Sequence, residues 1–188
     1  MSGTCITIAA VLPTIVTMKI RAATTEDAAA CAAIYAPYVT DTAISFETEP
    51  PTQAEMAERI VTAERTHAWL VLEDLEDDGR VVGYAYAGPW RSRPAYRWTC
   101  ETSIYLEVGR RRSGSGRALY EARLAQLAER GYRTAVAGMT VPNEASVALH
   151  RAMGFEPVGT FREVGRKNGR WYDVAWSQRS ITQGSRSR

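Results

Sequence analysis

The stretch VGRRRSGSGRA, residues 108–118, is the one that decides the fold. Before it, residues 97–108 predict a strand, because Thr, Ile, Tyr and Val suit a pleated surface. After it, residues 117–130 predict a helix, which Gly131 ends. A glycine loop between a strand and a helix N-terminus presents backbone N–H groups and about half a positive charge to a ligand. The stretch therefore predicts an anion site, and a pyrophosphate suits its geometry.

Two well-known phosphate loops do not fit this stretch. A Walker A loop requires GxxxxGK(S/T), and although Gly109 and Gly114 have the glycine spacing, Ser115 stands where the Lys should be. A dinucleotide fingerprint requires Gly or Ala at its third conserved position, and here Gly114 and Gly116 are followed by Leu119. A flexible arginine-rich turn without a ligand stays open as the alternative.

The elements on either side alternate between strands and helices. Strands are predicted over 19–22, 68–73, 80–89, 135–140, 155–161 and 171–178. A helix over 28–35 is ended by Pro37, a second follows the capping box of Thr52 and Glu55, and a third covers 144–153. In the second helix, Met56, Ile60 and Val61 are predicted to share one face, and residues 40–49 before it are predicted as a loop. This pattern predicts an α/β fold with a central mixed sheet.

Length and composition limit the class of protein. With 188 residues, 45% of them hydrophobic and 23% charged, the chain fits one globular domain and excludes collagen, coiled coil and general disorder. The 23 Lys and Arg against 21 Asp and Glu leave a formal charge of +2, which does not support general polyanion binding. Cys5, Cys31 and Cys100 are scattered, and only His67 and His150 accompany them. Neither a metal site nor a disulfide framework is expected, and a reducing cytoplasm fits better.

The two ends of the chain lack the pattern of the rest. Residues 1–17 are largely apolar without the preceding positive charge of a signal peptide, and are interpreted as an extension, disordered or upstream of a true start at Met18. The chain has no run of 18 apolar residues, so no membrane span is expected. Residues 18–181 are predicted as one domain, and residues 182–188 as a frayed basic tail.

Two motifs in order resemble a known superfamily. The pattern R/Q-x-x-G-x-G/A between strand and helix, here Arg111, Gly114 and Gly116, resembles the acetyl-CoA pyrophosphate motif of the GNAT N-acetyltransferases. About thirty residues later, residues 143–155, NEASVALHRAMGF, are similar to that superfamily's second signature, NxxSxxLYxxxGF. The resemblance implies acetyl-CoA as co-substrate, no metal, and a mixed, mostly antiparallel sheet flanked by helices.

A subgroup can also be identified. Residues 87–101, AGPWRSRPAYRWTCE, resemble the phosphinothricin acetyltransferases and the related enzymes that acetylate methionine sulfone and methionine sulfoximine. Residues 44–50, 104–106 and 165–174 agree with that subgroup. The resemblance implies transfer to the α-amino group of such an amino acid, a herbicide-resistance activity, a cytoplasmic location and a homodimer. Residues 172–178 are the candidate interface strand, because they hold more aromatic side chains than one small core needs.

The resemblance also implies roles for single residues. Glu101 is expected as the base for the amine, and His150, where the general superfamily pattern has Tyr, as the acid for the leaving thiolate. The acetyl-CoA contacts are expected at Ile104, Tyr105, Leu106, Arg111, Arg112, Ser113, Gly114, Ser115, Gly116 and Asn143. The acceptor contacts are expected at Phe46, Arg91, Arg93 and Trp98, since Arg can clamp a carboxylate or a tetrahedral head group. Tyr120, Trp171 and Asp173 also match positions of the family, but core packing or a dimer interface would explain them equally well.

Three other functions are alternatives to an amino-acid acetyltransferase. The nearest is an acetyltransferase for protein N-termini or ribosomal proteins, which the tryptophan- and arginine-rich loop disfavours. A non-catalytic acyl-CoA-binding domain would not need Glu101 and His150 at the positions that match the family, so their presence favours catalysis. A nucleic-acid binder that uses residues 110–112 and 162–170 has no recognition motif to support it, so neither nucleic acid nor membrane is expected as a partner.

Overall fold

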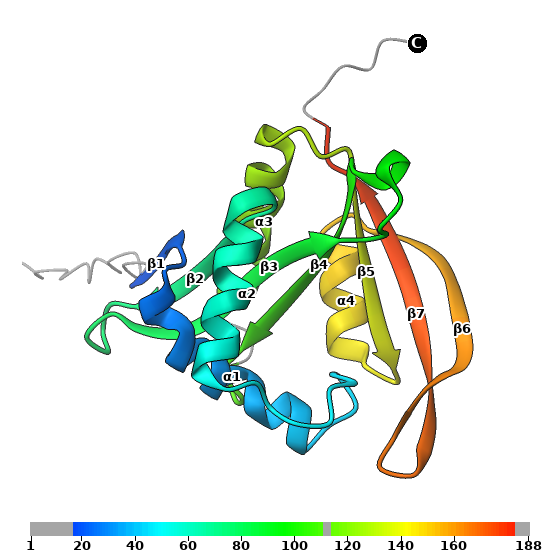
Figure 1. Cartoon of the computed structure of the whole chain (residues 1–188), viewed down its shortest axis with the longest axis horizontal. Helices are drawn as coiled ribbons and strands as arrows, with labels where there is room; N and C mark the ends of the chain where they lie inside the picture. The colour runs from blue at the N-terminus through cyan, green and yellow to red at the C-terminus, as the bar shows by residue number, and fades with distance from the viewer. Residues whose placement is uncertain (1–16, 111–113, 183–188) are drawn as a thin grey trace, which may run out of the picture.

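The computed structural model describes residues 17–110 and 114–182, so nearly all of the predicted extension and tail lies outside it. The described chain forms a seven-stranded sheet in the order β1-β2-β3-β4-β5-β7-β6 (Figure 1). The strands are β1 (Met18–Ala22), β2 (Trp69–Asp74), β3 (Arg80–Pro89), β4 (Thr99–Leu106), β5 (Thr134–Val141), β6 (Glu156–Lys167) and β7 (Arg170–Ser180). All neighbours are antiparallel except β4 and β5. The predicted mixed, mostly antiparallel sheet is confirmed.

Helices cover both faces of this sheet. They are α1 (Ala28–Thr40), α2 (Gln53–Thr66), α3 (Ser115–Glu129) and α4 (Glu144–Ala152), with short 3-10 turns η1 (Thr25–Asp27) and η2 (Pro94–Tyr96). One core cluster joins α1 and α2 to β2 and β3, and includes Tyr84. The next residue, Ala85, lies in a cluster with α3 on the opposite face, since successive strand residues point to opposite sides. None of the described helices has the length and apolar character needed to cross a bilayer.

Two predicted details of the helices are wrong. Pro37 does not end α1, which continues to Thr40 because the Pro37 carbonyl still accepts the N–H of Asp41 at 3.0 Å. In α2, Met56 and Ile60 are each 1% exposed but Val61 is 38% exposed. Val61 follows Ile60 by one residue and so lies about 100° farther round the helix, whereas Met56 and Ile60 are one turn apart.

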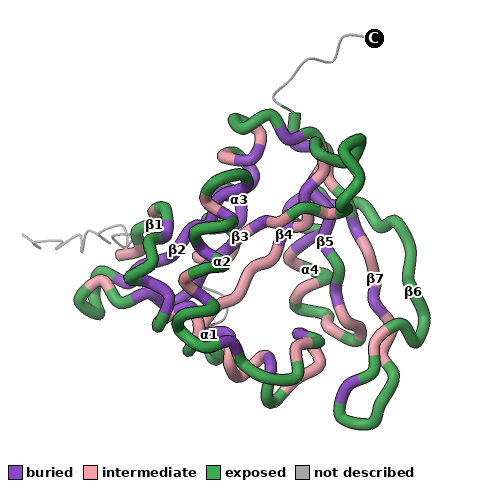
Figure 2. The backbone as a smooth tube through the Cα atoms, viewed as in Figure 1, coloured by how far each residue is buried: buried purple, intermediate pink, exposed green. Residues whose placement is uncertain are grey.

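The C-terminal hairpin differs from the sequence prediction in length and in exposure. β6 runs to Lys167 rather than stopping at 161, and its register with β7 shifts between Phe161 and Gly165. Asn168 and Gly169 both have positive φ, the geometry of a tight hairpin turn. β6 is the outer strand and is exposed along most of its length (Figure 2). β7, the predicted interface strand, lies between β5 and β6 with both of its edges paired, so only its faces are open to a partner.

The feature that positions the functional site is an opening in the middle of the sheet. The parallel pair β4 and β5 is in register only at Thr99, Cys100 and Glu101, which pair with residues 134–136. Beyond Glu101 the two strands part, and α4 lies behind the gap (Figure 1). The second half of β4 thus keeps β3 on one side and has an open edge toward β5.

Candidate active site

The open edge of β4 contains Ile104, Tyr105 and Leu106, the residues expected to meet the pantetheine arm. Their side chains are half-buried and their backbones pair with β3 through residues 83–85. The Leu106 carbonyl is already occupied, because it accepts the Tyr38 hydroxyl at 2.6 Å. The side chain of Tyr105 packs edge-on against Tyr35 and Tyr38 of α1. The groups that β4 offers to the opening are therefore backbone groups of this segment other than the Leu106 carbonyl.

The glycine loop leads from β4 into α3. Gly114 is the N-cap of α3 with φ of +76°, and a Cβ built on it would meet no atom of the described residues within 4 Å. At Gly116 a Cβ would lie 3.0 Å from a methyl group of Leu106, so this glycine lets the first turn of α3 approach β4. Ser115 is the first residue of α3. These positions give the helix N-terminus an open face, as an anion site requires.

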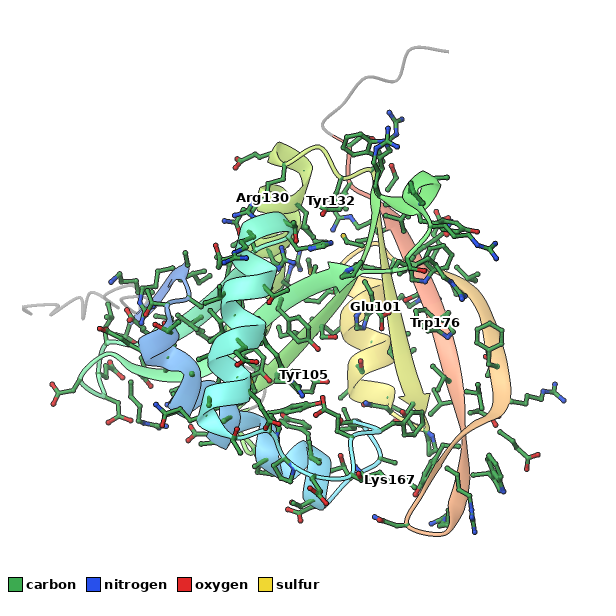
Figure 3. All side chains as sticks on the ribbon, in the orientation of Figure 1. Glu101, Tyr105, Arg130, Tyr132, Lys167 and Trp176 are labelled. Atoms are coloured by element: carbon green, nitrogen blue, oxygen red, sulfur yellow. The ribbon has the colours of Figure 1, made fainter. Side chains whose placement is uncertain are left out.

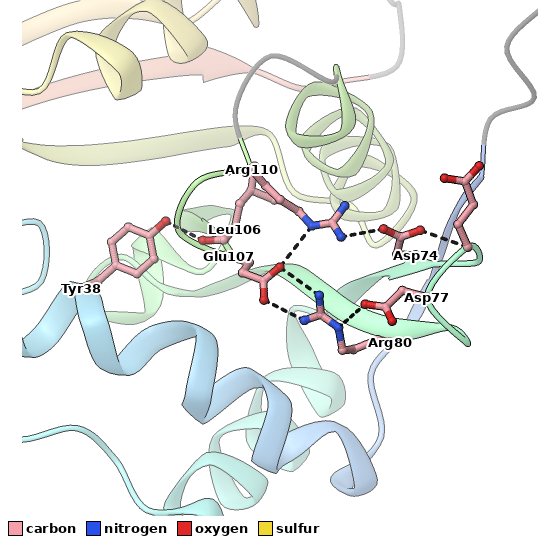
Figure 4. Close-up of polar contacts among 8 residues, drawn as sticks. Tyr38, Asp74, Asp77, Arg80, Leu106, Glu107 and Arg110 are labelled. Carbon is pink, nitrogen blue, oxygen red and sulfur yellow. Dashed lines mark hydrogen bonds and ion pairs between the residues drawn. The ribbon is translucent and has the colours of Figure 1, made fainter.

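Arg111, Arg112 and Ser113, the other residues expected at the pyrophosphate, lie outside the described residues. The segment that enters this loop is held by ion pairs (Figure 4). Arg110 binds Asp74 at 2.6 Å and Glu107 at 3.2 Å, and Glu107 also pairs with Arg80 at 2.7 Å. Arg110 itself is therefore held within the fold, which removes one of the arginines that a nucleic-acid binder would need.

Glu101 lies at the point where β4 and β5 part (Figure 3). Its neighbours Cys100 and Thr102 are buried, and Cys100 packs with Tyr120 of α3. Because strand residues alternate, Glu101 points to the other face, the one covered by α1 and α2. Burial raises the pKa of its carboxyl, an effect that the positive charge of Arg91 partly opposes. A carboxylate with a raised pKa is a better proton acceptor than an exposed one.

His150 lies in α4 on the opposite face, 5% exposed. Its Nδ1 is 2.8 Å from the carbonyl of Ser146, which can only accept, so Nδ1 carries the ring proton. Its Nε2 is 3.0 Å from the Tyr120 hydroxyl and accepts a hydrogen bond from it. Burial lowers the pKa of the imidazole and raises that of Tyr120. Tyr120, whose role the sequence left open, is thus the partner of His150, and both are neutral at pH 7.

The other predicted residues are dispersed around this centre. Asn143 is the N-cap of α4, where its Oδ1 accepts the N–H of Ser146 at 3.1 Å. Arg91 lies over the Trp90 ring, 4.9 Å from its centroid, and is close enough to affect Glu101. Arg93 is exposed at the start of η2. Trp98 packs beside Gly131 in the loop after α3, which gives it a packing contact at the end of that helix.

Phe46 belongs to the loop between α1 and α2, which the β6–β7 hairpin holds from outside. Its ring fills the space beside Gly165, where any Cβ would lie 2.2 Å from it. The ammonium of Lys167, 5% exposed, donates to the carbonyls of Val39 and Ser45 at 2.5 and 2.7 Å. Lys167 carries no signal of this role in the sequence, because no local pattern relates it to a loop 122 residues away.

Among the described residues, no group of three or more His, Cys, Asp or Glu side chains could hold a metal ion. The arrangement offers instead a carboxyl group with a raised pKa on one face of the sheet, a Tyr–His pair on the other, and an opening lined by backbone groups between them. Such a set can move protons to and from a reaction that takes place within the opening.

Comparison with known proteins agrees with this geometry. Residues 20–176 match the sequence profile described as "Acetyltransferase (GNAT) domain". A phosphinothricin N-acetyltransferase of Streptomyces viridochromogenes is 39% identical over 164 residues, 87% of this chain and 88% of that protein. An L-methionine sulfoximine/L-methionine sulfone acetyltransferase of Salmonella typhimurium is 32% identical, covering 88% and 96% of the two chains. The solved phosphinothricin acetyltransferase of Sinorhizobium meliloti, in complex with acetyl-CoA, superposes with a TM-score of 0.84 at 36% identity, over 92% of each chain.

Proposed function

The chain belongs to the GNAT family and is an acetyl-CoA-dependent N-acetyltransferase; from this premise we propose that its acceptor is the α-amino group of a small amino acid. The acceptors we name are phosphinothricin, methionine sulfoximine and methionine sulfone. They are the ones in the names of the relatives described above, and the 87–101 segment agrees with that subgroup.

Acetyl-CoA fits the groups that the opening offers. Its pyrophosphate would meet the backbone N–H groups at Gly114, Ser115 and Gly116, where the α3 N-terminus has an open face. The amide groups of the pantetheine arm would continue the hydrogen bonding of β4 along its free edge, with Asn143 at the far side. A backbone N–H of residues 104–106 would donate to the thioester oxygen, which makes the carbonyl carbon more electrophilic.

Glu101 acts as the base in this proposal. An amino-acid acceptor arrives as an ammonium ion and must lose a proton before it can attack. The raised pKa of Glu101 makes its carboxylate a stronger base for the ammonium proton. Because Glu101 faces α1 and α2, the acceptor would approach from the face of the sheet that these helices cover. Arg91, whose charge reaches Glu101, and Arg93 would bind the acceptor carboxylate, with Phe46 as one wall.

The acid role falls to His150 together with Tyr120. The proton that reaches the thiolate would come from the Tyr120 hydroxyl, which donates to Nε2 of His150, and the tyrosinate left behind would regain a proton from solvent after CoA leaves. Both groups are buried, so water does not compete for this proton. We therefore assign protonation of the leaving thiolate to the pair as one unit, on the face opposite to Glu101.

The observation that carries this proposal is the placement of base and acid on opposite faces of the sheet at one opening. Glu101 faces α1 and α2, whereas His150 packs with Tyr120 and Phe155 behind the sheet. An amine entering from one side and a thiol leaving from the other each find the proton carrier they need.

The test is acetyl-CoA-dependent thiol release with phosphinothricin, methionine sulfoximine, methionine sulfone and a peptide with a free N-terminus. We expect turnover with at least one of the three amino acids and little with the peptide. Turnover with the peptide alone would favour a protein N-terminal acetyltransferase. If acetyl-CoA binds but no thiol is released with any of these four acceptors, the proposed acceptor class is wrong.

A further inference from the structure

A groove of about 690 Å³ lies beneath α2, on the same face of the sheet as Glu101. Its floor consists of aromatic rings: Trp69 stacks on Tyr86 and Tyr84 with ring centroids 4.6 and 5.1 Å away. Met56 and Ala63 of α2 form much of the wall. This volume lies within the usual range for sites that enclose a small molecule.

The groove opens beside Glu101. Gly88 lines the groove and is directly opposite Glu101 in the antiparallel pair of β3 and β4, so the two residues point to the same face. Tyr86, two residues before, also lines the groove, and the negative charge of Glu101 contributes to the raised pKa of its hydroxyl. A Cβ built on Gly88 would meet no atom within 4 Å. The space beside the base therefore continues into the groove.

The charges around the groove disfavour an anion. Glu55 and Glu58 lie along its α2 rim. Arg59, the one arginine or lysine among the described lining residues, is already paired with both carboxylate oxygens of Glu47 at 2.8 and 2.9 Å. His67, which also lines the groove, has a pKa lowered by burial and stays neutral. A negatively charged group in the groove would meet two carboxylates without a free cation to balance it.

We propose that this groove binds the side chain of the acceptor amino acid, and that this side chain is long and uncharged. The inference rests on the proposed function: with the amine at Glu101 and the carboxylate at Arg91, the remaining substituent on the α-carbon is directed into the groove. Thioether, sulfone and aromatic side chains fit the aromatic floor. The anionic head of phosphinothricin fits it less well, so methionine sulfone, methionine and phenylalanine are the preferred class.

Two variants on adjacent positions of α2 separate the groove from general effects on the helix. Thr62 is exposed and lines the groove, so Thr62→Trp fills it from the outside without disturbing the core. Val61 is also exposed but does not line the groove, so Val61→Trp is the matched control. A third variant, Gly88→Leu, introduces a side chain into the open space beside Glu101 at a position whose φ is not in the left-handed region.

The first measurement is kcat/KM for alanine, methionine, phenylalanine, methionine sulfone and phosphinothricin. We expect methionine sulfone to exceed phosphinothricin by tenfold or more, and Thr62→Trp to reduce kcat/KM for the long neutral acceptors by about tenfold or more. Alanine, which does not reach the groove, should be unaffected, and Val61→Trp should resemble the parent. Gly88→Leu should reduce kcat/KM for all the amino acids while acetyl-CoA affinity is retained.

The second measurement is calorimetric binding of methionine sulfone to the full chain saturated with CoA, which does not depend on turnover. Binding that is lost in Thr62→Trp and kept in Val61→Trp supports the groove even if no acceptor is acetylated, a result that would overturn only the proposed function. Equal binding by parent and Thr62→Trp, no detectable binding by the parent, or a preference for phosphinothricin that Thr62→Trp leaves unchanged would each overturn the groove assignment.

Discussion

At Glu101, the consequence of burial can be measured as a pH dependence. The pKa of the carboxyl is raised, so kcat/KM of the parent should fall as pH drops through a value above that of an ordinary Glu. Glu101→Gln removes this base and should lower turnover by roughly 10² to 10⁴-fold. Relative to the parent, the loss should be greatest at pH values above the pKa of Glu101 and below that of the acceptor amine, where Glu101 is ionised and the amine is still protonated, and it should diminish as pH rises toward the pKa of the amine. The measurement is the pH–rate profile of both proteins.

The control for this variant is its affinity for acetyl-CoA, which should change little because Glu101 faces the acceptor side. If Glu101→Gln keeps near-parental turnover from pH 6 to 9, Glu101 is not the base and the reaction relies on positioning and backbone donors.

The His150–Tyr120 pair predicts non-additive effects. His150→Ala and Tyr120→Phe should each reduce turnover by roughly 10² to 10⁴-fold, and the double variant should lose little more than either alone, because both changes remove the same proton carrier. Alkaline pH should not rescue them, since it supplies a base but no acid for the thiolate. Steady-state kinetics of the three variants measures the coupling, and strictly multiplicative losses would contradict the shared role.

The sequence could single out Glu101 and His150 as candidates because each stands in a stretch that resembles the family. It could not decide between a site and a core role for Tyr120, which lies 30 residues before His150 and joins it only when α3 and α4 pack. The same limit applies to the opposite faces of the two groups. The alternation of β4 fixes the face of Glu101, but which helices cover that face is a property of the folded sheet.

At the scale of elements, the glycine loop can be tested at Gly114. Gly114→Val places a branched side chain into the open space at the α3 N-terminus, where phosphate oxygens would meet backbone N–H groups, so acetyl-CoA affinity should fall tenfold or more. Gly79→Val is the matched control, because Gly79 has a similar φ of +72° and an equally open surrounding in the β2–β3 turn. Calorimetry with acetyl-CoA decides: equal affinities in two folded variants would refute the loop assignment.

A second element-scale prediction concerns the contact between the β6–β7 hairpin and the α1–α2 loop. Lys167→Met leaves the carbonyls of Val39 and Ser45 without their donor, at a cost of about 1–3 kcal/mol in stability. The loop that carries Phe46 should loosen, so KM for the acceptor should rise more than kcat falls. Lys19→Met removes an exposed ion pair with Glu73 and should leave both the stability and the KM for the acceptor unchanged. Thermal unfolding and steady-state kinetics test this, and an unaltered KM in Lys167→Met would show that the contact is structural only.

The elements themselves were largely predictable from local sequence, and the exceptions have local reasons. The register of β6 shifts after Phe161, which interrupts the alternation of its side chains. The sequence pattern therefore stops near residue 161, although the strand continues to Lys167. Asn168-Gly169 is a strong hairpin signal that the sequence contained and the prediction did not use. Pro37 is compatible with the last turn of α1 because its own carbonyl still accepts the hydrogen bond from the N–H of Asp41.

For the whole molecule, the exposed outer strand predicts a dimer. β6 has an unpaired edge, and Val158, Phe161 and Val164 on it are 55–61% exposed, with Trp171 of β7 at 58% nearby. A long apolar edge is an unfavourable surface for a monomer, so we expect a homodimer that buries it. Phe161→Lys should shift the mass toward the monomer, whereas Val108→Lys, equally exposed but remote from β6, should not. Light scattering across a concentration series measures this, and a parent that stays monomeric throughout would contradict it.

In the proposed reaction, the acceptor amine and the leaving thiol occupy opposite faces of one opening between β4 and β5. The most direct measurement is a crystal structure of the full chain with CoA and methionine sulfone bound together. We predict that the pyrophosphate lies at the N-terminus of α3, that the sulfur of CoA lies on the Tyr120–His150 side, and that the amine lies within hydrogen-bonding reach of Glu101, directly or through one water. An acceptor bound on the face of α3 and α4, or an amine with no path to Glu101, would contradict the account.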